Sequence, residues 1–98
     1  MEILVVGVNH KDAPVAVREM LAFTPAQMDS ALSSLHERTS ECVLLSTCNR
    51  TEIYSVVPTV EEGRQEIMDF LSQFHRFPAR HFIPFLFSMS GREAVEHL

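Results

Sequence analysis

Two short apolar runs lie so close together in this chain that they predict a β-hairpin. The first covers Cys42–Thr47, and the second covers Thr51–Val57 and stops at Pro58. Both are rich in the branched and aromatic residues typical of strands. Only Cys48-Asn49-Arg50 separates them, and a connection of this length favours a tight turn between antiparallel strands. The sequence therefore predicts that these three residues lie at a hairpin turn.

Helical patterns occur before and after the hairpin. Thr24-Pro25-Ala26-Gln27 has the form of a capping box with proline at the first helical position, and apolar residues at helical spacing follow it to about Arg38. A second capping box at Thr59-Val60-Glu61-Glu62 opens a segment of the same periodicity that runs to about His75. A shorter helical segment is expected directly after Pro14.

The remaining apolar runs predict the outer strands. These are Ile3–Val8 and Phe82–Ser88, and Pro84 indicates that the start of the second run lies outside the sheet ladder or at a sheet edge. Ser90-Gly91-Arg92-Glu93 predicts a third capping box, which opens a helix reaching Leu98. The order β-α-β-β-α-β is typical of a ferredoxin-like split β-α-β domain. We therefore expect an α+β fold with one antiparallel sheet and helices packed on one face.

Length and charge narrow the class of protein. Ninety-eight residues with 46% hydrophobic composition fit one compact domain. The chain has 8 Lys and Arg against 13 Asp and Glu, and the basic residues are scattered along the sequence. No basic surface that would bind a nucleic-acid backbone is therefore predicted. Neither a signal-peptide pattern nor an apolar run of about eighteen residues occurs. The expectation is a cytoplasmic protein without a membrane span.

The chain has two cysteines, Cys42 and Cys48, and their spacing matches neither a CxxC pair nor half of a zinc site. On one extended strand they would lie roughly 20 Å apart, too far for a disulfide. Free thiols in a reducing compartment are therefore expected. No metal site is predicted, and Gly7, Gly63 and Gly91 form no phosphate-binding loop.

Cys48 allows two interpretations. A thiol at a strand end is accessible, and Arg50 beside it would raise the thiolate fraction, which favours a nucleophile. The alternative is a small packed residue, which is also the expectation for Cys42 in mid-strand. On the residues alone, both interpretations of Cys48 stay open.

Arg50 and His97 each have a functional and a structural interpretation. Arg50 can bind a carboxylate through two parallel hydrogen bonds, or it can form a surface pair with Glu52. His97 lies one helical turn after Glu93, so it either forms a surface ion pair or acts as a general base facing Cys48.

Three blocks of the sequence closely resemble the glutamyl-tRNA reductases, which begin the five-carbon route to tetrapyrroles. The blocks are Gly7–Pro14 with Val17-Arg18-Glu19, Leu45–Tyr54, and Glu93–Leu98. The resemblance implies that residues 1–98 are the N-terminal part of the catalytic domain. It also implies that an NADPH-binding domain and a helical domain that makes the parent a homodimer are absent from this chain.

The resemblance also implies roles for five residues. Cys48 would take glutamate from glutamyl-tRNA as a thioester. Arg50 would select the glutamate γ-carboxylate, with Thr47 and Asn49 lining the same pocket. His97 would accept a proton or orient a neighbour. In the full-length enzyme NADPH, bound outside this fragment, would then reduce the thioester to glutamate 1-semialdehyde, a step that the fragment alone cannot complete.

The partner implied is the aminoacylated acceptor end of glutamyl-tRNA, with Asn9 and His10 near the pocket. Because the last helix stops at Leu98, we also expect uncovered apolar sheet surface and self-association of the fragment. The alternative function is a non-enzymatic ferredoxin-like interaction or regulatory module with a structural cysteine, and a weaker one is a redox-sensing thiol domain. Faster alkylation of Cys48 than of Cys42 would favour the nucleophile.

Overall fold

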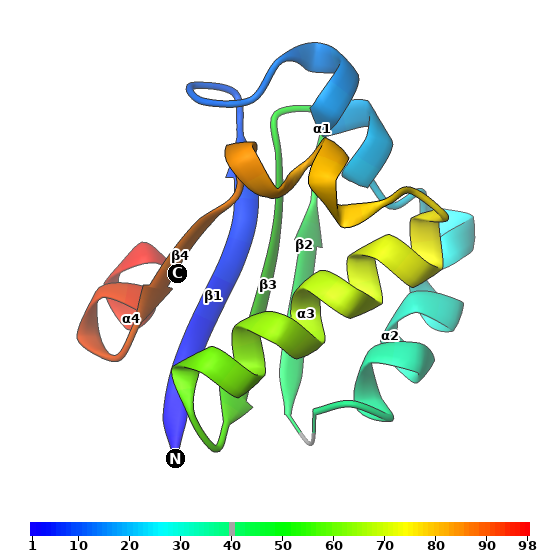
Figure 1. The fold of residues 1–98 in the computed structure, drawn as a ribbon. Coiled ribbons are helices and arrows are strands. Elements are labelled where there is room, and N and C mark those ends of the chain that lie inside the picture. The colour runs from blue at the N-terminus through cyan, green and yellow to red at the C-terminus, as the bar shows by residue number, and fades with distance from the viewer. Residues whose placement is uncertain (40) are drawn as a thin grey trace.

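One four-stranded antiparallel sheet organises the chain in the computed structural model, which describes residues 1–39 and 41–98. Its spatial order is β2-β3-β1-β4 (Figure 1). The strands are β1 (Glu2–Asn9), β2 (Cys42–Ser46), β3 (Arg50–Val57) and β4 (Phe87–Ser90). Every neighbouring pair is antiparallel, so β1 and β2 run parallel with β3 between them. The expected α+β fold with an antiparallel sheet is confirmed.

Within residues 1–39 and 41–98, four α-helices pack around the sheet. They are α1 (Val15–Leu21), α2 (Met28–His36), α3 (Val60–His75) and α4 (Arg92–His97). Two of the three predicted capping motifs form: Gln27 Oε1 accepts from the Thr24 N–H at 2.9 Å, and Thr59 Oγ1 accepts from the Glu62 N–H at 3.2 Å. The first opens the 3-10 turn Pro25–Gln27 instead of an α-helix, and α2 follows directly from Met28. Across the described ranges, no helix is long and apolar enough to cross a membrane.

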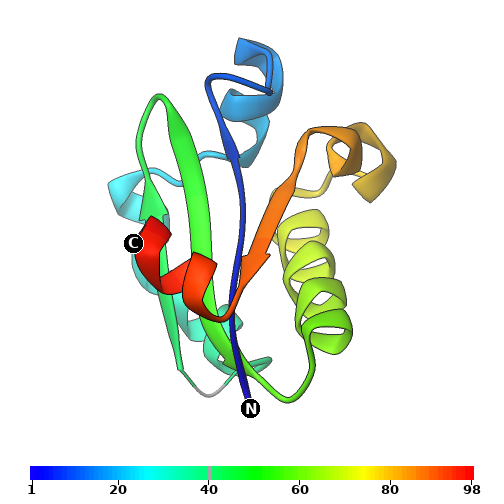
Figure 2. The same cartoon turned by 90° about the vertical axis from the view of Figure 1, so that its left-hand side faces the viewer.

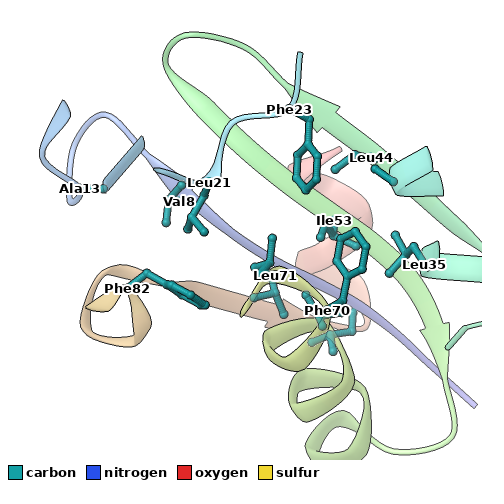
Figure 3. Packing of buried hydrophobic residues seen from close by; sticks show 14 of the residues in the cluster. Val8, Ala13, Leu21, Phe23, Leu35, Leu44, Ile53, Phe70, Leu71 and Phe82 are labelled. Carbon is teal, nitrogen blue, oxygen red and sulfur yellow. The ribbon is translucent and has the colours of Figure 1, made fainter. Parts of the chain in front are cut away.

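The main core lies between the sheet and helices α1, α2 and α3. Strand alternation turns Leu4, Val6 and Val8 of β1 toward these helices, and all three are buried. Phe70 of α3 and Phe23, which follows α1, stack at 5.9 Å in the same core (Figure 3). This face of the sheet is therefore closed by a continuous apolar layer.

The opposite face is covered by α4, which lies across β1 from α3 (Figure 2). Here Val5, Tyr54 and Ala94 form a second, smaller buried cluster. The prediction of helices on one face is thus right for α1–α3 and wrong for α4. The physical reason is Gly91, whose φ of 59° and ψ of −132° turn the chain across the sheet in a conformation that favours glycine.

The last strand begins later than predicted. Within the expected strand Phe82–Ser88, Ile83–Phe85 forms a 3-10 turn, and β4 starts only at Phe87. Pro84 has no N–H for a sheet ladder but fits the first positions of a helical turn. The predicted capping box at Ser90 is also wrong, because Ser90 ends β4 and Gly91 takes the N-cap position without a side chain.

Candidate active site

Cys48 lies exposed, as a free thiol, at the predicted hairpin turn. The Thr47 N–H donates to the Arg50 carbonyl at 2.8 Å. Thr47 Oγ1 accepts from the N–H groups of Asn49 at 3.2 Å and Arg50 at 3.3 Å. The turn is therefore held by its own threonine, and Arg50 is the first residue of β3 rather than a turn residue.

Arg18 of α1 links the thiol turn to the loop that follows β1. Its NH1 donates to the Cys48 carbonyl oxygen at 3.3 Å, and its Nε donates to the Ala13 carbonyl oxygen at 3.2 Å. The contact places a permanent positive charge beside the backbone of Cys48. The sequence analysis assigned no role to Arg18. The one sequence signal for it was its position in the first block that resembles the glutamyl-tRNA reductases.

Asn9 lies beside the turn because it is the register partner of Arg50 in the β1–β3 pairing. Its Oδ1 accepts from the backbone N–H groups of Lys11 at 3.1 Å and Asp12 at 3.2 Å, which shapes the loop. The Asn9 side chain therefore stabilises the backbone of its own loop. His10, the next residue, is exposed on the same loop.

Strand β3 turns three polar side chains toward the face that α4 covers, namely Arg50, Glu52 and Tyr54. The Arg50 side chain is 46% exposed, but that of Glu52 is only 2% exposed, and Arg50 NH1 lies 3.7 Å from Glu52 Oε2. Tyr54 Oη donates to Glu52 Oε1 at 2.8 Å. Burial first, and then this hydrogen bond, raise the pKa of Tyr54 to about 12.

His97 reaches the same carboxylate from α4. Its Nε2 lies 3.0 Å from Glu52 Oε2, and its ring packs against Phe87 of β4 at a centroid distance of 5.3 Å. The acidic partner of His97 is thus Glu52 on the sheet, where the structural interpretation from sequence expected Glu93. Sequence reasoning missed this buried role of Glu52, although alternation along β3 puts it on the same face as Tyr54.

Gly7 of β1 provides the space for the Glu52 side chain. The two residues are register partners, and a Cβ on Gly7 would lie 2.3 Å from the Thr51 carbonyl oxygen and 3.1 Å from Glu52 Cγ. No side chain fits there without moving β3. Gly7 is also paired with Phe87 on its other side, so the two residues that His97 contacts flank Gly7 in the sheet.

Cys42 differs from Cys48 in its surroundings. It is half-buried, packs against the main core, and its Sγ lies 3.8 Å from His36 Nε2 and 3.9 Å from His36 Nδ1. Both cysteines are free thiols, and the packed role expected for Cys42 is confirmed. Over residues 1–39 and 41–98, no three or more His, Cys, Asp or Glu side chains gather as a metal site.

A cavity of about 570 Å³ lies at the other end of β3, lined in part by Met1, Val57 and Glu66. It is separated from Cys48 by the length of the strand, which is eight residues. The position of the thiol and its polar neighbours, rather than cavity volume, therefore identifies the candidate site.

Fold and site together define an α+β domain that presents an accessible thiol at a hairpin turn. The strand that leaves this turn carries an arginine and a buried carboxylate that binds a histidine. The profile of the family described as "Glutamyl-tRNAGlu reductase, N-terminal domain" matches residues 6–98. The chain belongs to this family, as the resemblance of its three sequence blocks implied.

Relatives agree with this assignment. The chain is 45% identical over 100 residues to a glutamyl-tRNA reductase of Geobacillus thermodenitrificans and 43% identical to that of Bacillus subtilis, covering 100% of this chain and 22% of each relative. It also matches the solved structure of glutamyl-tRNA reductase from Methanopyrus kandleri with a TM-score of 0.67 and 25% identity, covering 97% of this chain and 20% of that one. The chain thus spans about a fifth of the length of these relatives.

Proposed function

We propose that this chain is the part of a glutamyl-tRNA reductase that captures glutamate from glutamyl-tRNA as a thioester on Cys48. The observation that carries the proposal is the exposed, free thiol at the hairpin turn of a chain whose relatives bear that name. Cysteine is the most nucleophilic side chain near neutral pH, and it forms covalent acyl intermediates readily.

In the capture step the Cys48 thiolate attacks the ester carbonyl carbon that joins glutamate to the 3′ end of the tRNA. A carbon–sulfur bond forms, and the bond from that carbon to the ribose oxygen breaks. The proton that the Cys48 thiol loses on becoming a thiolate passes to the ribose oxygen, which leaves as a hydroxyl, so atoms and charge balance. We assign His97 to this proton transfer, either as acceptor or as orienting group.

Arg50 is proposed to select glutamate. Its NH1 lies 3.7 Å from Glu52 Oε2, and the half-exposed guanidinium has further N–H groups for the γ-carboxylate of the substrate. Thr47 accepts two backbone hydrogen bonds through Oγ1 and keeps its own hydroxyl hydrogen to donate. With the exposed Asn49, these side chains would line one pocket around the glutamyl group.

Reduction and dimerisation are assigned to parts of the longer relatives outside these 98 residues. Gly7, Gly63 and Gly91 lie in β1, in α3 and directly before α4, so they supply no glycine-rich loop for NADPH. The residues present do not fit that cofactor, and the proposal for this chain ends at acyl capture. We further propose a ferredoxin-like topology for the sheet, from its strand order, and a cytoplasmic location.

Incubation of the chain with tRNA charged with radiolabelled glutamate tests the proposal. The expected result is label on the protein that hydroxylamine releases, as a thioester requires. Cys48→Ser should abolish this label, whereas the matched control Cys42→Ser should retain it. Alkylation should also modify Cys48 much faster than Cys42 near neutral pH. Label that persists in Cys48→Ser, or equally slow alkylation of both thiols, would support the structural cysteine instead.

A further inference from the structure

Glu52 is the one buried acidic side chain of the candidate site that acyl capture, as proposed above, does not use. Burial of a carboxylate is costly unless donors surround it. Two hydrogen-bond partners and one cation do so: Tyr54 Oη at 2.8 Å, His97 Nε2 at 3.0 Å and, as an ion pair, Arg50 NH1 at 3.7 Å. They come from two elements, β3 and α4, so Glu52 joins the helix end to the strand that carries the thiol turn.

The two oxygens of Glu52 have different partners. Oε1 accepts from Tyr54, whose raised pKa of about 12 keeps the phenol protonated at neutral pH. Oε2 faces Nε2 of His97. An ionised carboxylate offers acceptors only, so the hydrogen of this contact must lie on Nε2. In a neutral imidazole ring the other nitrogen, Nδ1, then has the free lone pair.

We propose that Glu52 is a positioning residue that holds His97 as the Nε2–H tautomer and so makes Nδ1 the atom that accepts a proton during acyl capture. The inference rests on the proposed function and deepens it. In that step the sulfur–hydrogen bond of Cys48 breaks and a nitrogen–hydrogen bond forms at Nδ1. The resulting imidazolium keeps its Nε2–H bond to Glu52, and its Nδ1 proton then passes to the departing ribose oxygen.

The sheet fixes the orientation of the ring. Glu52, Gly7 and Phe87 lie at one level on β3, β1 and β4. His97 contacts the outer two, by the hydrogen bond to Glu52 and by ring packing on Phe87 at 5.3 Å. Because Gly7 has no side chain, Glu52 occupies the space above β1, where a Cβ would approach its Cγ to 3.1 Å. The carboxylate and the ring are thus preorganised before any substrate binds.

The ¹⁵N NMR spectrum of the His97 ring in this chain tests the proposal without any substitution. We expect the proton on Nε2 and an unprotonated Nδ1 in the neutral ring. Glu52→Gln keeps the shape but introduces an amide N–H that can donate to Nε2. The ring should then carry its proton on Nδ1, and the rate of glutamate capture should fall about 100-fold, as loss of a general base does.

Glu96→Gln is the matched control, since Glu96 is an exposed acid of the same helix that pairs with Arg92 at 3.4 Å. It should change neither the tautomer nor the capture rate. A wild-type ring protonated on Nδ1 in a protein that captures glutamate would overturn the role of Glu52 alone. An Nε2–H ring in a protein that forms no Cys48-dependent thioester would overturn the proposed function and, with it, the proton step.

Discussion

The two faces of the sheet differ in what they bury. Under α1–α3, sixteen buried hydrophobic residues form one core in the described part of the chain. Under α4, the corresponding cluster holds Val5, Tyr54 and Ala94, and the buried acid Glu52 lies among them. Apolar burial provides most of the free energy of folding. The comparison indicates that the first face stabilises the domain, which allows the second to hold a buried charge next to the thiol turn.

The largest effect is expected on the face that α1–α3 cover. Phe70→Ala removes a ring that is 1% exposed and should reduce the free energy of unfolding by about 3–5 kcal/mol. Urea denaturation measures this loss. Met89→Ala on the α4 face is the comparison, because this side chain is only partly buried. Equal losses in the two variants would show that the faces do not differ as described.

Gly7→Ala tests the close approach of β1 to Glu52. The added Cβ would meet the Thr51 carbonyl oxygen at 2.3 Å, so the backbone must shift. We expect a loss of about 1–3 kcal/mol, the usual range for overpacking. Denaturant unfolding of the variant measures it. An unchanged unfolding midpoint would mean that the space beside Glu52 is wider than the structure shows.

Tyr54→Phe removes a hydrogen bond to the buried carboxylate and should cost about 1.5–3 kcal/mol. A pH titration of the wild type gives a second measurement. Since folding raises the pKa of Tyr54 from 10.0 to about 12, this contribution is complete below pH 10 and is lost as pH rises toward 12. Ultraviolet absorbance should show no phenolate near pH 10, and phenolate there would contradict the buried pairing.

His75 gives the first face its own pH dependence. Burial lowers its pKa, and its ring packs 4.4 Å from that of Phe23. The unfolded chain therefore binds this proton more readily, so the contribution to stability is complete above pH 6.5 and is lost as pH falls below it. The slope should not exceed about 1.4 kcal/mol per pH unit. Comparison with His75→Phe isolates the effect, and identical pH profiles of stability would exclude it.

The smallest effect on stability is expected at the exposed edge of the α4 face. Ile3 and Val43 are 41% and 47% exposed, so Ile3→Thr with Val43→Thr should change the free energy of unfolding by no more than about 0.5 kcal/mol. The double variant should nevertheless self-associate less than the wild type in light scattering, because both residues belong to an uncovered apolar surface. A wild type that stays monomeric at high concentration would contradict this expectation.

Periodicity and caps were enough to predict the hairpin and helices α2 and α3, because each has a local signal that its packing reinforces. The last part of the chain was less predictable. The turn at Ile83–Phe85 competes with a strand in an apolar, aromatic run, and the path of α4 depends on the backbone of Gly91. Both features depend on tertiary packing, and the spacing of residue types along the sequence does not predict them.

Some residues of the candidate site were likewise predictable from local sequence, and others were not. Cys48 and Arg50 could be placed from the hairpin alone, since a turn and its flanking residues are local features. Glu52 could not, because in sequence it stands two residues from Arg50 and resembles an ordinary surface partner. It becomes a buried acid only when α4 brings His97 over the sheet.

Gly7 also has a consequence for how this domain can change over generations. Any side chain at residue 7 collides with the backbone carbonyl oxygen of Thr51, so substitution there is tolerated only if β3 moves away and takes the acid at residue 52 with it. Loss of the acid would in turn leave His97 without its partner. Residues 7, 52 and 97, which lie on β1, β3 and α4, should therefore either all stay the same or change together in evolution.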